Sequence, residues 1–259
     1  MLSKSQISLV ASLHQKKIRK QEGLFIAEGE KIVEELLASS CAIKKIFATE
    51  AFFEKHQGGK KNKFVTEWIE VSERELKKIS LLTTPNKALA LAVIPIQELE
   101  KEDFSSSLSL VLDNISDPGN LGTIIRIADW FGIRNIVCSG ETAECYNPKV
   151  VQASMGSLFR VKVHYTDLKN FLEQNSRTAK INVYGMLLQG ESIYNAGLTS
   201  SGFIVIGNES SGISDELIKY LTHALVIPPF STEGEKQVPD SLNAAVATAI
   251  VCAEFRRRG

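Results

Sequence analysis

Apolar runs and amphipathic segments follow one another along the second part of the chain. Short apolar runs predict strands, and apolar residues spaced three or four positions apart predict helices. Largely in alternation, these elements fall at residues 108–112, 120–131, 135–138, 149–159, 161–164, 168–175, 181–187, 203–206, 213–221, 224–227 and 241–257. Strands that alternate with helices require crossover connections, so we predict an α/β domain with a mostly parallel sheet that helices cover on both faces.

The first part of the chain has a different pattern. The predicted elements are a strand, a turn and an amphipathic helix within 23–37, strands at 43–48 and 89–94, and a helix near 72–80. Residues 98–107 (ELEKEDFSSS) are charged and then serine-rich, which is typical of a linker. We therefore expect a small α/β domain at 1–97, a linker at 98–107 and the larger domain at 108–259.

The composition is that of an ordinary globular protein, with 44% hydrophobic and 23% charged residues among 259. No apolar stretch is long enough to span a bilayer and the N-terminus lacks the apolar core of a secretory signal, so we expect a cytoplasmic protein without a membrane partner. The formal net charge is zero, which leaves room only for a local nucleic-acid surface. The four cysteines are scattered without a CxxC pair, and no metal site is expected.

A turn signal, DPGN, follows the first strand of the larger domain and ends at Asn120, which is placed to cap the next helix. The apolar side of that helix is formed by Ile124, Ile127, Ala128 and Phe131. Arg126 falls off this side, where a cation beside a polar loop can clamp a phosphate or orient a hydroxyl. A solvated helix arginine explains the same residue and is the commoner case.

A second polar block, GNESSG at 207–212, follows the strand at 203–206. Its glycines let the backbone approach a ligand closely, and Glu209 is the one charge in the loop. A tight turn with an exposed glutamate is the structural alternative.

A third polar block precedes the last predicted helix, for which Ser241 is a natural N-cap. One side of this helix is formed by Leu242, Ala245, Val246, Ala249, Ile250 and Ala253. The small alanines permit close packing, so this side can belong to the core or to a subunit interface, and the core is the simpler expectation.

Taken in this order, the three blocks resemble the motifs of the SpoU family, the knotted RNA ribose methyltransferases. The family pattern NxxDxxNxGxxxRxAxxFG is matched at Asn114, Asp117, Asn120, Gly122, Arg126, Ala128, Phe131 and Gly132. The GxExxG block is matched at 207–212 and the SLN signature at 241–243. The chain departs from the pattern in a longer segment at 230–240 and in Ala244–Ala245, which replaces a more common Val-Ser.

This resemblance implies a fold and a reaction. The fold is an α/β domain with a deep trefoil knot that binds S-adenosylmethionine, in an enzyme that acts as a homodimer. The reaction is methyl transfer to a ribose 2′-hydroxyl of structured RNA, with ribosomal RNA as the expected substrate. A transfer-RNA substrate, a base as the methyl acceptor, and a non-catalytic RNA-binding or ribosome-assembly protein that keeps the knotted fold are the alternatives.

The resemblance also implies roles for single residues. Arg126 would activate the hydroxyl, held together with the substrate by Asn120, Glu209, Ser241 and Asn243. The implied cofactor contacts are Gly207, Ile227 and Leu242, with Leu187 and Leu188 near the pocket. No metal is needed, because a sulfonium methyl group is already electrophilic.

The N-terminal domain resembles the ribosomal-protein-like substrate-binding domain of some SpoU members. The segments that carry this resemblance are FIAEGEKIVEELL, LLTTPNKALALAVIP and a basic run at 16–20. The residues expected to contact RNA phosphates are Lys16, Lys17, Arg19 and Lys20. A solvated basic helix is an equal alternative for this run.

Overall fold

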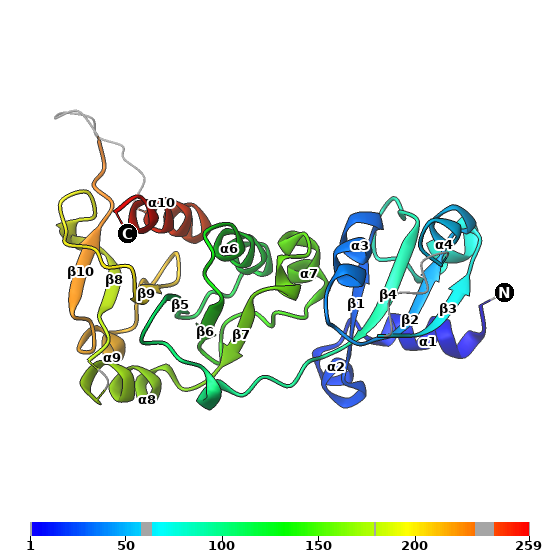
Figure 1. Cartoon of the computed structure of the whole chain (residues 1–259), viewed down its shortest axis with the longest axis horizontal. Coiled ribbons are helices and arrows are strands. Elements are labelled where there is room, and N and C mark those ends of the chain that lie inside the picture. Colours follow the sequence, from blue (N-terminus) through cyan, green and yellow to red (C-terminus); the bar gives the residue numbers. More distant parts are fainter. Residues whose placement is uncertain (1, 58–63, 179, 231–240, 259) are drawn as a thin grey trace. The chain divides into compact units, whose positions relative to one another are not determined.

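The computed structural model describes residues 2–57, 64–178, 180–230 and 241–258. Its contacts divide the chain into two units (Figure 1). The first unit contains residues 1–96 and 144–160, and the second contains residues 97–143 and 161–259. The sequence-based boundaries assign 144–160 to the larger domain, whereas contacts group this segment with the N-terminal residues.

The first unit is built on a mixed four-stranded sheet in the order β1-β4-β2-β3. Its strands are β1 (Leu24–Glu28), β2 (Ile43–Ala48), β3 (Val65–Glu70) and β4 (Ala88–Val93). Its helices are α1 (Lys4–Ser12), α2 (Lys16–Glu22), α3 (Glu30–Ala38), α4 (Glu50–Gln57), α5 (Glu73–Ile79), α7 (Pro148–Ser154) and the 3-10 turn η2 (Ser157–Phe159). Part of the core lies where Leu24 and Ile26 of β1 and Leu89 and Leu91 of β4 pack together.

Residues 144–160 lie in the chain between two strands of the second unit, at 135–138 and 162–165, but belong to the first unit. Their aromatic side chains pack on Phe25 of β1, with ring centroids 4.8 Å away for Tyr146 and 6.3 Å for Phe159. The predicted helix over 149–159 is interrupted, because Met155 and Gly156 both adopt left-handed backbone with φ of 52° and 93°. A side chain at Gly156 would collide with Glu35 of α3, which explains the glycine at that turn.

The second unit is built on a parallel six-stranded sheet, and the sequence predicts the parallel arrangement. The strand order is β10-β8-β9-β5-β6-β7. Its strands are β5 (Leu108–Leu112), β6 (Asn135–Cys138), β7 (Lys162–Tyr165), β8 (Val183–Ser192), β9 (Gly202–Ile206) and β10 (His223–Val226). Its helical segments are η1 (Leu99–Lys101), α6 (Pro118–Trp130), α8 (Leu168–Glu173), η3 (Gln174–Thr178), α9 (Asp215–Ile218) and α10 (Ala244–Arg258). In the described residues, no helix has both the length and the apolarity needed to cross a membrane.

Helices α6 and α10 pack against each other, and both begin differently from the prediction. In α6 the N-cap is Asp117, whose carboxylate accepts a hydrogen bond from the Asn120 backbone N–H at 2.8 Å. In α10 the side chain of Asn243 accepts from the Ala245 N–H at 3.0 Å, so Ser241 is not the N-cap. The capping roles predicted for Asn120 and Ser241 are therefore wrong, and the side chain of Asn120 is left free for other partners.

The prediction that the Leu242, Val246 and Ile250 side of α10 faces the core is also wrong. The buried face is instead formed by Ala244, Ala245, Thr248, Val251, Cys252, Glu254 and Phe255. Leu242 and Val246 are 46% and 49% exposed. On α6 the buried residues are Leu121, Gly122, Ile124, Ile125 and Ala128, so the predicted stripe is rotated by about one residue. The sequence distinguishes an apolar side from a polar one, but α10 has apolar residues on both sides.

Candidate active site

The first two polar blocks lie side by side because their strands are neighbours. Leu112 at the end of β5 pairs with Ile206 at the end of β9, so the loops that follow both strands leave the same edge of the sheet. The Asn208 side chain donates to the Asn114 carbonyl at 2.9 Å and joins the two loops. Asn114 has φ of 59°, a left-handed conformation that asparagine tolerates better than most residues.

A buried carboxylate reinforces the same junction. Asp113, which directly follows β5, is 7% exposed, and its Oδ2 accepts from both the backbone N–H and the hydroxyl of Ser214, each at 2.8 Å. Neither Asp113 nor Asn208 has a role that the sequence motifs predict. A polar residue at the end of an apolar strand is the signal that was available for Asp113.

One amide side chain connects all three polar blocks. Asn120 on α6 donates from Nδ2 to Oε1 of Glu209 in the second block, while its Oδ1 accepts from Nδ2 of Asn243 at 2.9 Å. Both ends of the Asn120 amide are thus used, and its rotation is fixed by two partners of opposite hydrogen-bonding character. The structure brings together three of the residues expected to serve catalysis, from positions 120, 209 and 243.

Ser241 joins this cluster through the backbone. Its hydroxyl donates to the carbonyl oxygen of Glu209 at 3.3 Å, so the segment before α10 contacts the second block directly. The neighbouring segment 231–240, which holds most of the atypical stretch noted in the sequence, lies outside the described residues.

Arg126 lies two turns further along α6 and faces outward. At about 100° per residue, its position is about 120° around the helix from Asn120. Its side chain is exposed and makes no hydrogen bond or ion pair with any described residue. The structure therefore does not place Arg126 in the amide cluster of its own chain, and its guanidinium is available to an external anion.

Gly207 is required by the shape of its own loop. A Cβ atom at this position would come within 2.2 Å of the Gly212 carbonyl carbon and 2.3 Å of the Ile213 nitrogen. The loop closes on itself because the backbone N–H of Asn208 donates to the Gly212 carbonyl at 3.0 Å and the reverse bond is 2.8 Å. A bulkier residue would open the loop that carries Glu209.

The other residues expected to contact the cofactor are distributed over three segments. Leu187 and Leu188 lie in β8, Ile227 directly follows β10, and Leu242 precedes α10. β8 and β10 are adjacent parallel strands. Leu187 packs against the core, whereas Leu188 is 75% exposed and Leu242 is 46% exposed. Exposed leucines are suited to contact the faces of a planar aromatic ligand.

The basic run of the first unit divides into two kinds of residue. Lys16, Lys17 and Lys20 of α2 are exposed. Arg19 is only 1% exposed and donates from Nη1 to the carbonyls of Leu13 and His14, each at 2.8 Å. Its Nε and Nη2 atoms also donate to Glu144. The expectation that Arg19 contacts RNA phosphates is therefore wrong for this structure, since its donors are satisfied inside the protein.

Across the residues that the structure describes, no group of three or more His, Cys, Asp or Glu side chains is arranged to hold a metal ion.

Comparison with known families and proteins agrees with this geometry. Residues 107–253 match the family described as the SpoU rRNA Methylase family, and residues 4–90 match the MRM3-like substrate binding domain. The chain is 30% identical over 247 residues to the 23S rRNA (guanosine(2553)-2′-O)-methyltransferase RlmP of Bacillus subtilis, with 94% of this chain and 93% of that protein aligned.

Two solved structures are similar over the whole chain. One is a putative RNA methyltransferase of the TrmH family from Porphyromonas gingivalis, with 38% identity, a TM-score of 0.88 and 100% of both chains covered. The other is an AdoMet-bound rRNA methyltransferase from Sinorhizobium meliloti, with 28% identity, a TM-score of 0.86 and coverage of 99% of this chain and 96% of that one.

Proposed function

Because the chain belongs to the SpoU rRNA methylase family, we propose that it methylates a ribose 2′-hydroxyl of ribosomal RNA. Membership of this family makes the protein an RNA methyltransferase, and its methyl donor is S-adenosylmethionine. The observation that carries the proposal is the hydrogen-bonded cluster of Asn120, Glu209 and Asn243, which draws one residue from each polar block to one edge of the parallel sheet.

The residues present fit the cofactor. The exposed leucines at 188 and 242 offer apolar surface for an adenine ring. Gly207 keeps the loop that carries Glu209 tightly closed, because its missing side chain leaves room for the backbone of Gly212 and Ile213. When bound, S-adenosylmethionine supplies a methyl group activated by the positive sulfur. We propose that Gly207, Ile227 and Leu242 hold it, with Leu187 and Leu188 at the rim.

The protein's main task is then alignment. A weakly acidic hydroxyl must be held in line with the methyl group, and positioning of this kind supplies a large part of the barrier reduction in two-reactant steps. We propose that Asn120, Glu209, Ser241 and Asn243 hold the loops and the substrate in this arrangement. The Asn120 amide makes this geometry specific, because both of its ends are hydrogen-bonded.

Arg126 acts as a cation in this proposal. A guanidinium keeps its proton in proteins, so it is suited to stabilise the developing alkoxide and the adjacent phosphate. Its exposure and its lack of a partner among the described residues leave it available for RNA.

Ribosomal RNA is favoured over transfer RNA by the first unit. The relative that aligns along 94% of this chain, including that unit, is named for 23S rRNA. We propose that residues 1–97 bind the RNA, that 98–107 link the domains and that 108–259 form the methyltransferase domain. Lys16, Lys17 and Lys20 supply a local basic patch on an otherwise neutral chain.

We further propose a homodimer and a trefoil knot in the second unit. Trp130 on α6 is 85% exposed, and Val246 on the adjacent α10 is 49% exposed. Exposed apolar side chains on two packed helices are suited to a subunit interface, which supports the interface role that the sequence left open for α10. The cytoplasmic location expected from the sequence stays a prediction.

Arg126→Ala tests the function directly. We expect turnover on ribosomal RNA fragments to fall by about a thousandfold, the upper end for loss of one charge-stabilising group, with cofactor affinity retained. Transfer of labelled methyl groups followed by ribose-specific digestion measures both the rate and the position of the product. Arg134→Ala, which removes an exposed arginine from the following loop, is the matched control.

Three outcomes would contradict the proposal. Near wild-type transfer by Arg126→Ala removes the role of Arg126. Label on the base shows a different reaction. Failure of the wild-type protein to bind S-adenosylmethionine in calorimetry favours a non-catalytic RNA-binding protein that keeps the fold.

A further inference from the structure

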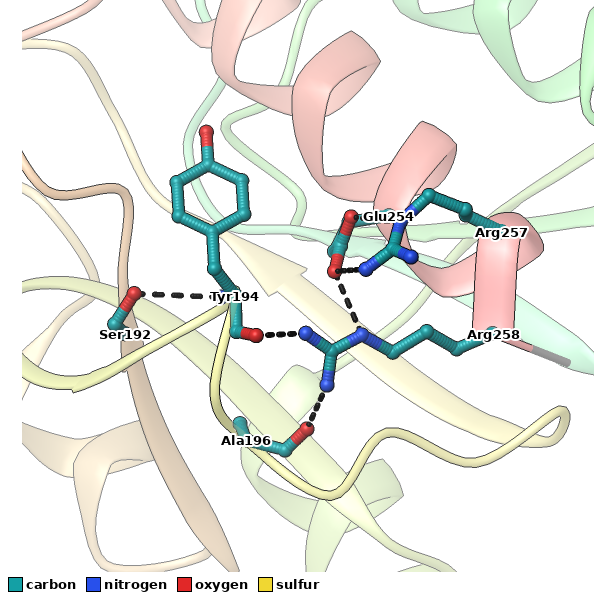
Figure 2. Close-up of polar contacts among 6 residues, drawn as sticks. All are labelled: Ser192, Tyr194, Ala196, Glu254, Arg257 and Arg258. Atoms are coloured by element: carbon teal, nitrogen blue, oxygen red, sulfur yellow. Dashed lines mark hydrogen bonds and ion pairs between the residues drawn. The ribbon is translucent and has the colours of Figure 1, made fainter.

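Helix α10 ends in three successive arginines, each with a different set of partners. Arg256 donates from Nε to the carbonyl of Phe131 at 2.7 Å and so joins α10 to the end of α6. Arg257 bonds Glu254 one turn earlier in the same helix. Arg258 reaches a separate segment, the turn that follows β8 (Figure 2). Cations at a helix C-terminus are favourable in general, but only Arg258 makes these cross-segment contacts to the turn.

The contacts of Arg258 use the whole guanidinium fork. Nη1 donates to the Ala196 carbonyl at 2.8 Å, Nη2 donates to the Tyr194 carbonyl, and Nε donates to Oε1 of Glu254 at 2.7 Å. Figure 2 shows the guanidinium between the helix and the turn. The side chain of Arg258 is 24% exposed, against 64% for Arg257. A planar fork with three fixed acceptors is rigid, because each bond restricts the other two.

Glu254 fixes the orientation of that fork. Its side chain is 8% exposed and accepts from both Arg257 and Arg258. Hydrogen bonds and ion pairs with Arg257, then Arg258, lower the pKa of Glu254 to about 2, so it remains ionised at neutral pH. The negative charge therefore persists on the helix side of the clamp.

The clamped turn is itself part of the sheet framework. Ile193 and Ala196 are 0% and 1% exposed, and the Ile193 N–H donates to the Val226 carbonyl of β10 at 3.0 Å. The Tyr194 N–H donates to the Ser192 hydroxyl at 3.3 Å, as drawn in Figure 2. The turn is thus attached to β8 by the chain and to β10 by a hydrogen bond, and it cannot move without disturbing both strands.

These attachments coincide with the segments assigned to the cofactor. Leu187 and Leu188 lie in β8, Ile227 directly follows Val226, and Leu242 lies two residues before α10 begins. Arg258, at the far end of α10, connects that helix to the turn after β8. At the other end of α10, Asn243 bonds Asn120. The helix is consequently fixed at its first turn by amides and at its last turn by guanidinium groups.

We propose that Arg258 is a positioning residue for S-adenosylmethionine binding, which holds the 192–196 turn against the end of α10 and so sets the spacing of β8, β10 and the end of that helix. The proposal rests on the cofactor contacts proposed above. Preorganisation of this kind improves affinity because the free protein already has the conformation that binds. Arg258 is remote from the amide cluster, so its loss should change cofactor binding and leave the rate of transfer at saturation nearly unchanged.

Arg258→Met and Arg257→Met form a matched pair for testing this role. Both remove one positive charge from the same helix turn and one partner of Glu254, but only the first removes the contacts to the turn. Titration calorimetry with S-adenosylmethionine should show binding weakened about tenfold by Arg258→Met and less than about twofold by Arg257→Met, since the loss of charged hydrogen bonds costs about this factor. Turnover at saturating cofactor should stay within about twofold of wild type for both.

Several results would overturn the proposal. Equal affinities for Arg258→Met and wild type would do so, as would equal losses in both variants, because charge or Glu254 pairing would then explain the effect. Reduced turnover at saturation with unchanged affinity would also overturn it. Absence of binding by the wild-type protein would instead contradict the cofactor assignment, so the two failures can be told apart.

Arg258→Lys covers the case in which Arg258→Met does not fold. A lysine keeps the charge but cannot bond two carbonyls and Glu254 in a fixed plane. We expect weaker cofactor binding and faster hydrogen exchange at the Ile193 and Ala196 amides, with exchange slowed again on saturation with S-adenosylmethionine. Wild-type affinity together with wild-type exchange in this variant would contradict the positioning role.

Discussion

The two ends of the α6–α10 helix pair are held together by different chemistry. At their beginnings, the neutral amide of Asn120 forms hydrogen bonds with both Asn243 and Glu209. At their ends, the guanidinium groups of Arg256 and Arg258 bond backbone carbonyls of α6 and of the turn after β8. Amides combine a donor and an acceptor, so they can chain three loops together. Guanidiniums only donate, and therefore attach one segment to the carbonyls of another.

This difference separates the expected consequences of mutation. At the amide end, side chains position other side chains, so substitutions there should displace the reacting groups. At the guanidinium end, side chains position backbone segments. Substitutions there should therefore change protein stability and the framework of the cofactor pocket.

The largest effect is expected at the amide end. Asn243→Ala removes the donor to Asn120 Oδ1 and the acceptor that caps α10, so we expect turnover to fall by about ten- to a hundredfold. Asn243→Asp keeps the cap but replaces the donor with an acceptor, and should lose turnover with less loss of stability.

A double-mutant cycle with Asn120→Ala measures the coupling. We expect the combined loss to be smaller than the product of the single losses, because both substitutions break one network. Independent effects on turnover would show that the two amides do not act together.

A smaller effect is expected for Arg256→Met at the guanidinium end. Its bonds to the carbonyls of Phe131 and Gly132 are exposed, so we expect unfolding free energy to fall by only about 1 kcal/mol. Urea denaturation measures this, with Arg257→Met as the control that leaves α6 untouched. A loss of turnover with unchanged stability would contradict the division between the two ends.

The smallest effect is a pH dependence that arises from Glu254. Its pKa is lowered from 4.5 to about 2 in the folded protein, chiefly by hydrogen bonds from Arg257 and then Arg258. A lowered acid pKa contributes stability that is complete above the unfolded value and is lost as pH falls through the folded value. Wild type should therefore lose urea resistance more steeply than Glu254→Gln from about pH 5 down to about pH 2. Parallel pH profiles for the two proteins would show that this carboxylate contributes nothing.

A pair of arginines shows what a motif can indicate and what a run of charges cannot. Arg126 was recognised by its place in a motif, and the structure leaves it exposed. Arg19 was grouped with neighbouring lysines on the basis of charge, yet its side chain is buried against Glu144, which is 125 residues away. Charge runs describe adjacency in the chain, whereas burial depends on which distant segment packs over each position.

Local pattern was sufficient for the order of most elements and for the three polar blocks. Strand and helix periodicity reflects contacts within a few residues, and parallel strands place their following loops at one edge, so the meeting of Asn120 with Glu209 follows from sequence and topology. Tertiary structure alone decided which residue caps α10, which of its two apolar sides is buried, and that Arg258 holds the turn after β8. Those outcomes depend on side chains distant in sequence, and the free energy of burying or pairing a group is fixed only when its neighbours are in place.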